Sequence, residues 1–254
     1  MTKMNWDESH ALDKLAQLSI KTGVALQPGQ DLLITAPMEA APLVRRLAHH
    51  AYKAGAGLVT PFYTDPEITL ARYQHAAPES FDKTTDWLFE GMAAAFDKNT
   101  ARLAVVGEDP MLLSGQNPEY VGRANQAMSK ASSPLRERIT RFDINWNIIA
   151  WPGLQWAKLV FPQMSDADAQ IALAEAIFNA SRVNTSDPNE AWAVHNKNLR
   201  ARTEWLNKKN FAALHFYGEG TDLTVGLADG HEWMGGASTA RNGVTCNPNI
   251  PSEE

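Results

Sequence analysis

The first 160 residues alternate between short, continuous apolar runs and longer stretches in which apolar residues recur at helical spacing. Apolar runs of this length are typical of strands that are buried on both faces of a parallel sheet. Helices between such strands form right-handed βαβ units. The pattern therefore predicts an α/β domain, a doubly wound, mostly parallel sheet over residues 1–160. Its strands are predicted at residues 32–35, 58–63, 103–107 and 146–151.

The pattern changes after residue 160. Ser165 is followed three residues later by Asp168, and Asp187 precedes a proline and an acidic first turn, so both positions predict helix starts. The predicted helices make residues 161–209 a linking segment. Residues 210–254 are instead rich in short β-type runs, and we expect them to be the beginning of an antiparallel β-rich (α+β) domain that is truncated in this sequence.

Two of these runs, residues 212–217 and 223–227, are predicted as strands. Asp229-Gly230 is a favoured dipeptide of tight hairpin turns, so we expect residues 232–234 to form the returning strand. The first two strands place Leu214, Phe216, Leu223 and Val225 on an apolar face that nothing in this sequence covers.

Composition and charge limit the partners and the compartment that we expect for the chain. The chain has 254 residues, 44% of them apolar and 20% charged, which is typical of a folded globular protein. Its net charge of −6 predicts no nucleic-acid partner and no binding to an anionic membrane surface. No apolar run approaches the length of a membrane span. The single cysteine, Cys246, excludes an internal disulfide and predicts a reducing, cytoplasmic compartment.

The sequence gives little support for a nucleotide site, a metal site made of histidines or a cysteine nucleophile. The turn after the first predicted strand, residues 35–40, lacks phosphate-binding glycines and carries Glu39, which argues against a nucleotide site. His49 and His50 are adjacent on a predicted helix, so their side chains diverge and would not share a metal ion. His195 lies on another amphipathic helix, where a packed or surface histidine is the common case. Cys246 has no histidine placed beside it.

The last residues, 247–254 (NPNIPSEE), form a proline-braced loop that ends in two acids. Carboxylates on a rigid loop suit a divalent cation. A terminal acid pair is more often a solvated tail, and the residues alone favour that interpretation for Glu253 and Glu254.

Four stretches favour the metal interpretation over the solvated tail, because together they resemble one protein family. They are residues 26–30 (LQPGQ), 51–56 (AYKAGA), 218–223 (GEGTDL) and 247–254 (NPNIPSEE). They resemble the aminopeptidase T / aminopeptidase S family, also called thermophilic metalloproteases. The N-terminal match is moderately specific, and the last two stretches together, in this order and separation, are highly specific. The resemblance spans essentially the whole chain.

The resemblance implies a metal-dependent aminopeptidase that removes N-terminal residues from peptides with two divalent metal ions, zinc, cobalt or magnesium. It implies a homodimer and makes the segment from residue 210 the start of the catalytic domain. Glu254 aligns with the first metal ligand of the family, and Glu253 is the second choice. The remaining ligands and the catalytic base are expected beyond residue 254, so we expect this chain alone to bind metal poorly and to be inactive. The alternative is a non-catalytic α/β domain for dimerisation or peptide binding.

Overall fold

The central feature of the molecule is a parallel sheet of five strands in the order β2-β1-β3-β4-β9. A computed structural model describes residues 10–252. Every neighbouring pair in this sheet is parallel. The strands are β1 (Leu32–Pro37), β2 (Val59–Thr64), β3 (Ala101–Val106), β4 (Trp146–Ala150) and β9 (Asn249–Ile250). The predicted α/β class and the mostly parallel sheet are confirmed.

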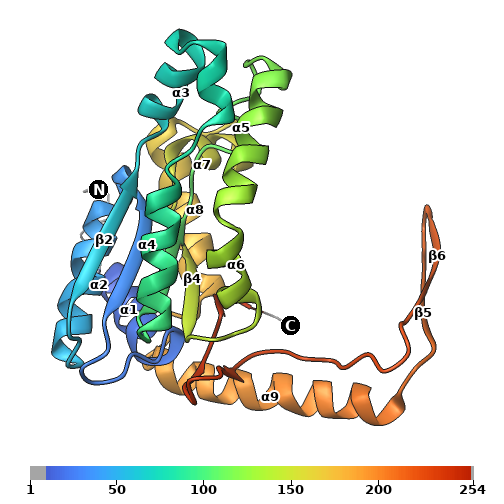
Figure 1. The fold of residues 1–254 in the computed structure, drawn as a ribbon. Coiled ribbons are helices and arrows are strands. Elements are labelled where there is room, and N and C mark those ends of the chain that lie inside the picture. The colour runs from blue at the N-terminus through green and yellow to red at the C-terminus, as the bar shows by residue number, and fades with distance from the viewer. Residues whose placement is uncertain (1–9, 253–254) are drawn as a thin grey trace.

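Helices connect the strands and cover both faces of the sheet (Figure 1). The first helix, α1, continues into a π-helical turn at Ser19–Gly23. Short 3-10 turns lie at Met38–Ala40 and Pro78–Asp82. The helices are α1 (His10–Leu18), α2 (Ala41–Lys53), α3 (Pro66–His75), α4 (Asp86–Asp97), α5 (Pro118–Ala131), α6 (Ser133–Thr140), α7 (Leu154–Val160), α8 (Asp166–Ala180) and α9 (Pro188–Lys209).

Alternate residues of each strand supply the two cores. Ile34 and Leu103 face a large core that also contains side chains of α1, α2, α8 and the first turns of α9. Leu33 faces a smaller core built from α4, α6 and their neighbours, including Phe96 and Ile144. Burial on both faces explains why these strands are continuous apolar runs rather than alternating ones.

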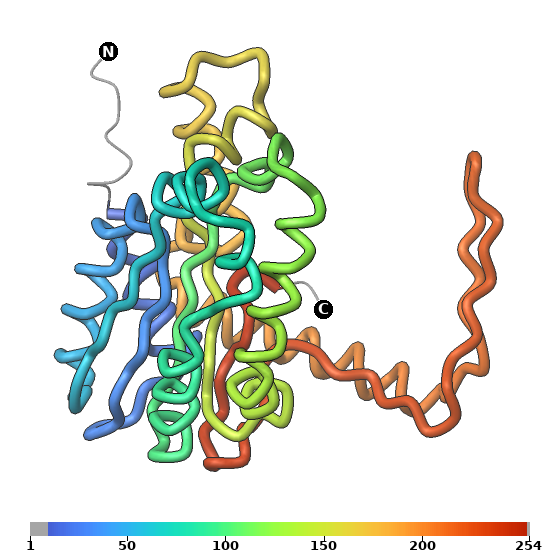
Figure 2. Tube along the Cα trace, turned by 45° about the horizontal axis from the view of Figure 1, so that its top comes forward, coloured from blue at the N-terminus to red at the C-terminus, as the bar shows by residue number. Residues whose placement is uncertain are grey.

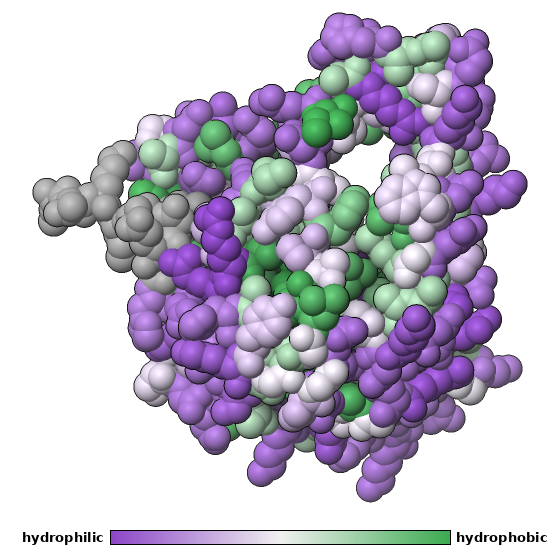
Figure 3. Space-filling model, turned by 60° about the vertical axis from the view of Figure 1, so that its left-hand side comes forward, coloured by the Kyte–Doolittle hydropathy of each residue, from purple (hydrophilic) through white to green (hydrophobic). Residues whose placement is uncertain are grey.

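The free edge of the sheet at β2 has two features that discourage strand addition. Leu32 N–H donates to the Leu58 carbonyl, so by alternation Val59 and Pro61 direct their backbone groups away from β1. The Val59 N–H donates to the Tyr52 hydroxyl at 3.1 Å, and Pro61 has no N–H to offer. Both features are typical of a protected edge. Figure 3 shows the side of the molecule that carries β2, where hydrophobic residues gather in the centre and hydrophilic ones surround them.

Helix α9 carries a β-hairpin away from the sheet (Figure 1). The hairpin consists of β5 (Ala213–Gly218) and β6 (Thr221–Gly226), which are antiparallel. The predicted turn at Asp229-Gly230 is wrong as a hairpin turn, and residues 232–234 form no strand. The hairpin turns instead at Glu219-Gly220, where Gly220 has a φ of 73° that favours glycine.

The hairpin has one apolar face and one polar face. Leu214 pairs with Val225, and Phe216 pairs with Leu223, so the predicted apolar face is present. Phe216 is 51% exposed and Leu223 is 53% exposed. On the other face His215 contacts Asp222 at 2.7 Å.

The segment after β6 returns along α9 to the sheet, as Figure 2 also shows. Asn207 holds this segment through hydrogen bonds with both backbone groups of Trp233. A small antiparallel pair, β7 (Ser238–Thr239) and β8 (Thr245–Cys246), precedes β9. Strand β9 thus belongs to the same sheet as β1 to β4. The division into domains at 160 and 209 stays a prediction.

Within residues 10–252, none of the helices combines the length and the apolar character that crossing a bilayer requires.

Candidate metal centre

The predicted metal loop enters the parallel sheet as its last strand. Ile148 pairs with Asn249 and Ile149 with Ile250, so β9 runs in the same direction as β4. The chain therefore leaves β9 at the carboxyl edge of the sheet, where open α/β proteins build their binding sites. The predicted ligands Glu253 and Glu254 follow Ser252 in sequence, and they lie outside the described residues.

Backbone and amide hydrogen bonds fix the start of this loop against the sheet. The Asn247 N–H donates to the Gly23 carbonyl at 2.8 Å, and the buried Asn147 side chain donates to the Asn247 carbonyl at 2.7 Å. Ile148 N–H donates to the Pro248 carbonyl at 2.7 Å. Asn247 itself is only 2% exposed. The loop thus begins from a fixed and desolvated position.

Helix α9 holds the same loop from the other side. Asn196 and Asn247 form a reciprocal amide pair, with donor–acceptor distances of 3.1 and 2.8 Å. His195 Nε2 lies 2.7 Å from the Ser252 carbonyl oxygen. These contacts join neighbouring residues of α9 to Asn247 and Ser252 of the loop.

His195 is itself held by its surroundings. It lies on the buried stripe of α9 with Trp192, whose indole N–H donates to the Ser181 carbonyl at 2.8 Å. The His195 and Trp192 rings meet edge to face at 5.3 Å. The Arg182 guanidinium stacks over the Trp192 ring and lies 3.2 Å from His195 Nδ1. The expectation that His195 is a satisfied packing residue is met.

Cys246 lies directly before the loop and is a structural residue. Its thiol is buried and donates to the Trp146 carbonyl at 3.6 Å. Burial raises the pKa of this thiol to about 11 because the charged thiolate is disfavoured away from water. A thiol that stays protonated is a poor nucleophile.

Apart from the loop, a cavity lies at the carboxyl ends of β1 and β3, where the strand order reverses and ligands commonly bind. It is a cavity of about 620 Å³ whose lining includes Glu39, Asp65 and Glu108. Glu39 accepts a hydrogen bond from the Leu154 N–H, while burial and then the nearby Glu108 raise its pKa. Carboxylates occupy the position that phosphates would need, which agrees with the argument against a nucleotide site.

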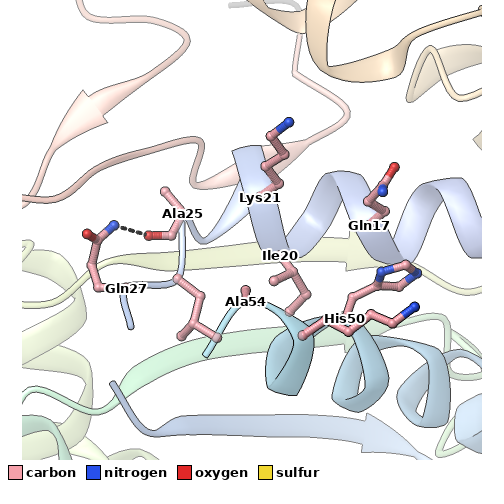
Figure 4. A pocket seen from close by; sticks show the side chains of 9 residues that line it. Gln17, Ile20, Lys21, Ala25, Gln27, His50 and Ala54 are labelled. Atoms are coloured by element: carbon pink, nitrogen blue, oxygen red, sulfur yellow. Dashed lines mark hydrogen bonds between the residues drawn. The ribbon is translucent and has the colours of Figure 1, made fainter. Parts of the chain in front are cut away.

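The adjacent histidines of α2 also form no shared site. The His49 and His50 rings lie edge to face at 5.7 Å, and His50 Nε2 contacts Asp13 at 2.9 Å. His50 lines a shallow cavity of about 330 Å³ beside the π-helical turn (Figure 4). There the Gln27 amide donates to its neighbour Ala25 rather than pointing at a common centre.

The donors of the described residues test whether a metal fits this chain. Among residues 10–252, no group of three or more His, Cys, Asp or Glu side chains could hold a metal ion. A dinuclear centre needs more ligands than one loop provides. Residues 10–252 therefore do not by themselves supply such a centre.

Comparison with known proteins shows the family of the chain. A sequence model described as thermophilic metalloprotease (M29) matches residues 8–254. The chain belongs to the thermophilic metalloprotease (M29) family. The resemblance drawn from the motifs is thus confirmed.

M29 relatives match nearly all of this chain. Aminopeptidase T of Thermus thermophilus is 48% identical over 243 residues, which are 96% of this chain and 60% of the relative. Aminopeptidase 2 of Geobacillus stearothermophilus is 38% identical over 98% of this chain. A solved structure of wild-type AmpT from Thermus thermophilus superposes with a TM-score of 0.90 at 47% identity, over 96% of this chain and 60% of that one. The chain spans about 60% of the length of the curated M29 relatives it matches.

The sequence analysis missed two residues that anchor the metal loop, Asn147 and Asn196. Their common partner, Asn247, is distant in the chain, so no local pattern marks them. His195 did leave a signal: it occupies a position on the apolar stripe Pro188, Trp192, Leu199. A polar side chain at such a position must find a hydrogen-bond partner, and this one finds the loop.

Proposed function

We propose that this chain is the N-terminal part of a metal-dependent aminopeptidase that removes N-terminal residues from peptides. The observation that carries the proposal is its 48% identity to an aminopeptidase T across 96% of its length. The anchored loop supports it, because the segment that aligns with the family's first metal ligand is held by hydrogen bonds from Asn147, Asn196 and His195.

In this proposal Glu254, or Glu253 as second choice, contributes the first ligand of a centre of two divalent ions, zinc, cobalt or magnesium. Such ions, when bound, polarise a carbonyl group and lower the pKa of a bound water. The chain's own contribution is geometric. Asn147, Asn196 and His195 hold residues 247–252 of the loop through hydrogen bonds to Asn247 and Ser252.

The proposal includes a homodimer, with a peptide as the substrate. The exposed apolar face of the hairpin supports association, because apolar surface of this kind is commonly buried at an interface. The same face favours the second candidate function, a non-catalytic domain for dimerisation or peptide binding. A cytoplasmic location rests on the single cysteine and stays a prediction.

The test is hydrolysis of aminoacyl p-nitroanilides by the full-length gene product. We expect activity that a chelator removes and that added zinc, cobalt or magnesium restores. Glu254→Gln should remove most activity, while Glu219→Gln on the exposed hairpin turn serves as the matched control. Full activity after exhaustive chelation would contradict metal dependence, and an inactive but metal-binding protein would favour the second candidate.

A further inference from the structure

The turn between β7 and β8 contains the one Asn-Gly dipeptide of the sequence, Asn242-Gly243. The glycine has no side chain to shield its backbone nitrogen, so this nitrogen can attack the side-chain amide carbon of the asparagine. A bond from the Gly243 nitrogen to Asn242 Cγ then forms, the bond from Cγ to Nδ2 breaks, and ammonia leaves with the hydrogen of the Gly243 N–H. Water opens the resulting succinimide ring and leaves aspartate or isoaspartate.

In the folded protein the side chain of Asn242 is held on both sides of its amide group. The Val244 N–H donates to Asn242 Oδ1 at 3.1 Å. Asn242 Nδ2 donates to Asn99 Oδ1 at 2.8 Å and to Asn145 Oδ1 at 2.9 Å. A rotation that turns Cγ toward the Gly243 nitrogen would break these hydrogen bonds.

The backbone of the turn is fixed as well. The Gly243 N–H donates to the Ala240 carbonyl at 2.9 Å, and the Ala240 N–H donates to the Val244 carbonyl at 2.9 Å. The Arg241 N–H donates to the Phe142 carbonyl at 2.8 Å, which ties the turn to the residues before β4. The attacking nitrogen must give up its hydrogen, and here that hydrogen is bound to a carbonyl oxygen. Deamidation therefore requires the turn to open, and its rate follows the population of the open state.

The product of the reaction does not fit the place of Asn242. Asn145 is fully buried, and its Nδ2 donates to the Val24 carbonyl at 2.6 Å, so its Oδ1 faces the turn. An aspartate at position 242 has no N–H group to donate to this oxygen, and its carboxylate would meet Asn145 Oδ1 oxygen to oxygen. Isoaspartate also routes the backbone through the side chain, which makes the chain too long for the same tight turn.

We propose that Asn242 is a deamidation site that the fold keeps closed: it converts to aspartate or isoaspartate when the β7–β8 turn opens, and the product prevents the turn from closing again. A reversible opening is thereby made irreversible, which limits how long the folded protein persists. The inference depends on the turn and its neighbours alone, so it holds whether or not the chain belongs to an active aminopeptidase.

The first experiment measures deamidation in this 254-residue chain by peptide mapping with mass spectrometry. The protein is incubated in mildly alkaline buffer, with and without urea above the unfolding midpoint. The rate at Asn242 should be at least about tenfold higher in urea, which corresponds to about 1.4 kcal/mol holding the turn closed. Asn198, exposed on α9 and followed by Leu199, is the internal control and should react more slowly than Asn242 in urea. Equal rates at Asn242 with and without urea, or an intact Asn242 in urea, would overturn the inference.

The second experiment tests the effect of the product. Asn242→Asp installs the aspartate directly and should lower the melting temperature by at least about 3 °C, because buried acceptors lose their donor. Asn198→Asp makes the same change of charge at an exposed position and should melt within about 1 °C of the wild type. If the two variants melt at the same temperature, the aspartate does fit the turn, and the inference that the product keeps it open is overturned.

Discussion

Gly23 shows how closely the loop is fitted to the sheet at the level of single residues. A Cβ atom at this position would lie 2.7 Å from Asn147 Oδ1, closer than such atoms approach in folded proteins. Asn147 cannot retreat freely because its amide nitrogen donates to the Asn247 carbonyl. The Gly23 carbonyl accepts the Asn247 N–H as well. One glycine therefore contacts both sides of the anchor.

We expect Gly23→Ala to lower the free energy of unfolding by about 1–3 kcal/mol, the usual effect of forcing extra volume into a packed site. Urea unfolding followed by tryptophan fluorescence measures it. Gly122→Ala is the control, because nothing lies within 4 Å of the corresponding Cβ on α5. That variant should gain up to about 1 kcal/mol from helix propensity. Equal effects of the two variants would contradict the packing argument.

The buried thiol of Cys246 predicts how the free energy of unfolding depends on pH. Burial raises the pKa of its thiol from 9.0 to about 11, so the folded protein holds this proton more tightly than the unfolded chain does. The free energy of unfolding should therefore fall as the pH rises from 9 to 11. Because lysines and tyrosines titrate in the same range, the measured quantity is the difference in slope between the wild type and Cys246→Ala. Identical slopes would show that the thiol is not protected as the structure indicates.

Among the elements, α9 carries most of the link between the loop and the rest of the molecule. Its N-terminus is capped by Asp187, whose carboxylate accepts the N–H groups of Asn189 and Glu190 at 2.9 and 3.2 Å. The sequence predicted this cap, and the structure has it. Downstream of the cap, Trp192 and His195 are buried, while Leu206 is only partly covered because the helix leaves the sheet.

Asp187→Ala should cost about 1 kcal/mol of stability, since two backbone donors lose their acceptor. Asp187→Asn keeps a capping oxygen and should remain within a few tenths of a kcal/mol of the wild type. Thermal unfolding by circular dichroism compares the variants under one buffer condition. If the asparagine variant is destabilised as much as the alanine variant, the charge rather than the cap is what α9 needs.

The predictions that failed for individual strands and turns have physical causes. Asp229-Gly230 does form a turn, but the strands on either side of it do not pair, because β6 already pairs with β5 across Glu219-Gly220. Strand β9 is only two residues long, too short to produce a pattern of its own. Its pairing with β4 depends on partners about 100 positions earlier, which a local reading of the chain cannot supply.

For the whole molecule, the fold was predictable and the site largely was not. Continuous apolar runs and caps are local signals, and they located β1 to β4 and the starts of α8 and α9. The site instead depends on polar contacts between distant segments, such as Asn147 with Asn247 and His195 with Ser252. Only the family resemblance favoured a metal loop over a solvated tail for residues 247–254. Glu253 and Glu254 as ligands therefore stay a prediction.

The metal-binding side chains of residues 10–252 lead to a prediction about metal removal. A ligand present at a hundred times its dissociation constant stabilises a folded protein by about 2.7 kcal/mol. Since residues 10–252 hold no group of three or more metal-binding side chains, we expect neither a chelator nor added Zn²⁺ or Co²⁺ to shift the melting temperature of this 254-residue chain. The longer metal-dependent enzyme that we propose, measured beside it, should lose stability on chelation. A saturable rise in the melting temperature of the 254-residue chain, absent from Glu254→Gln, would show that its own carboxylates bind metal tightly without the rest of the centre.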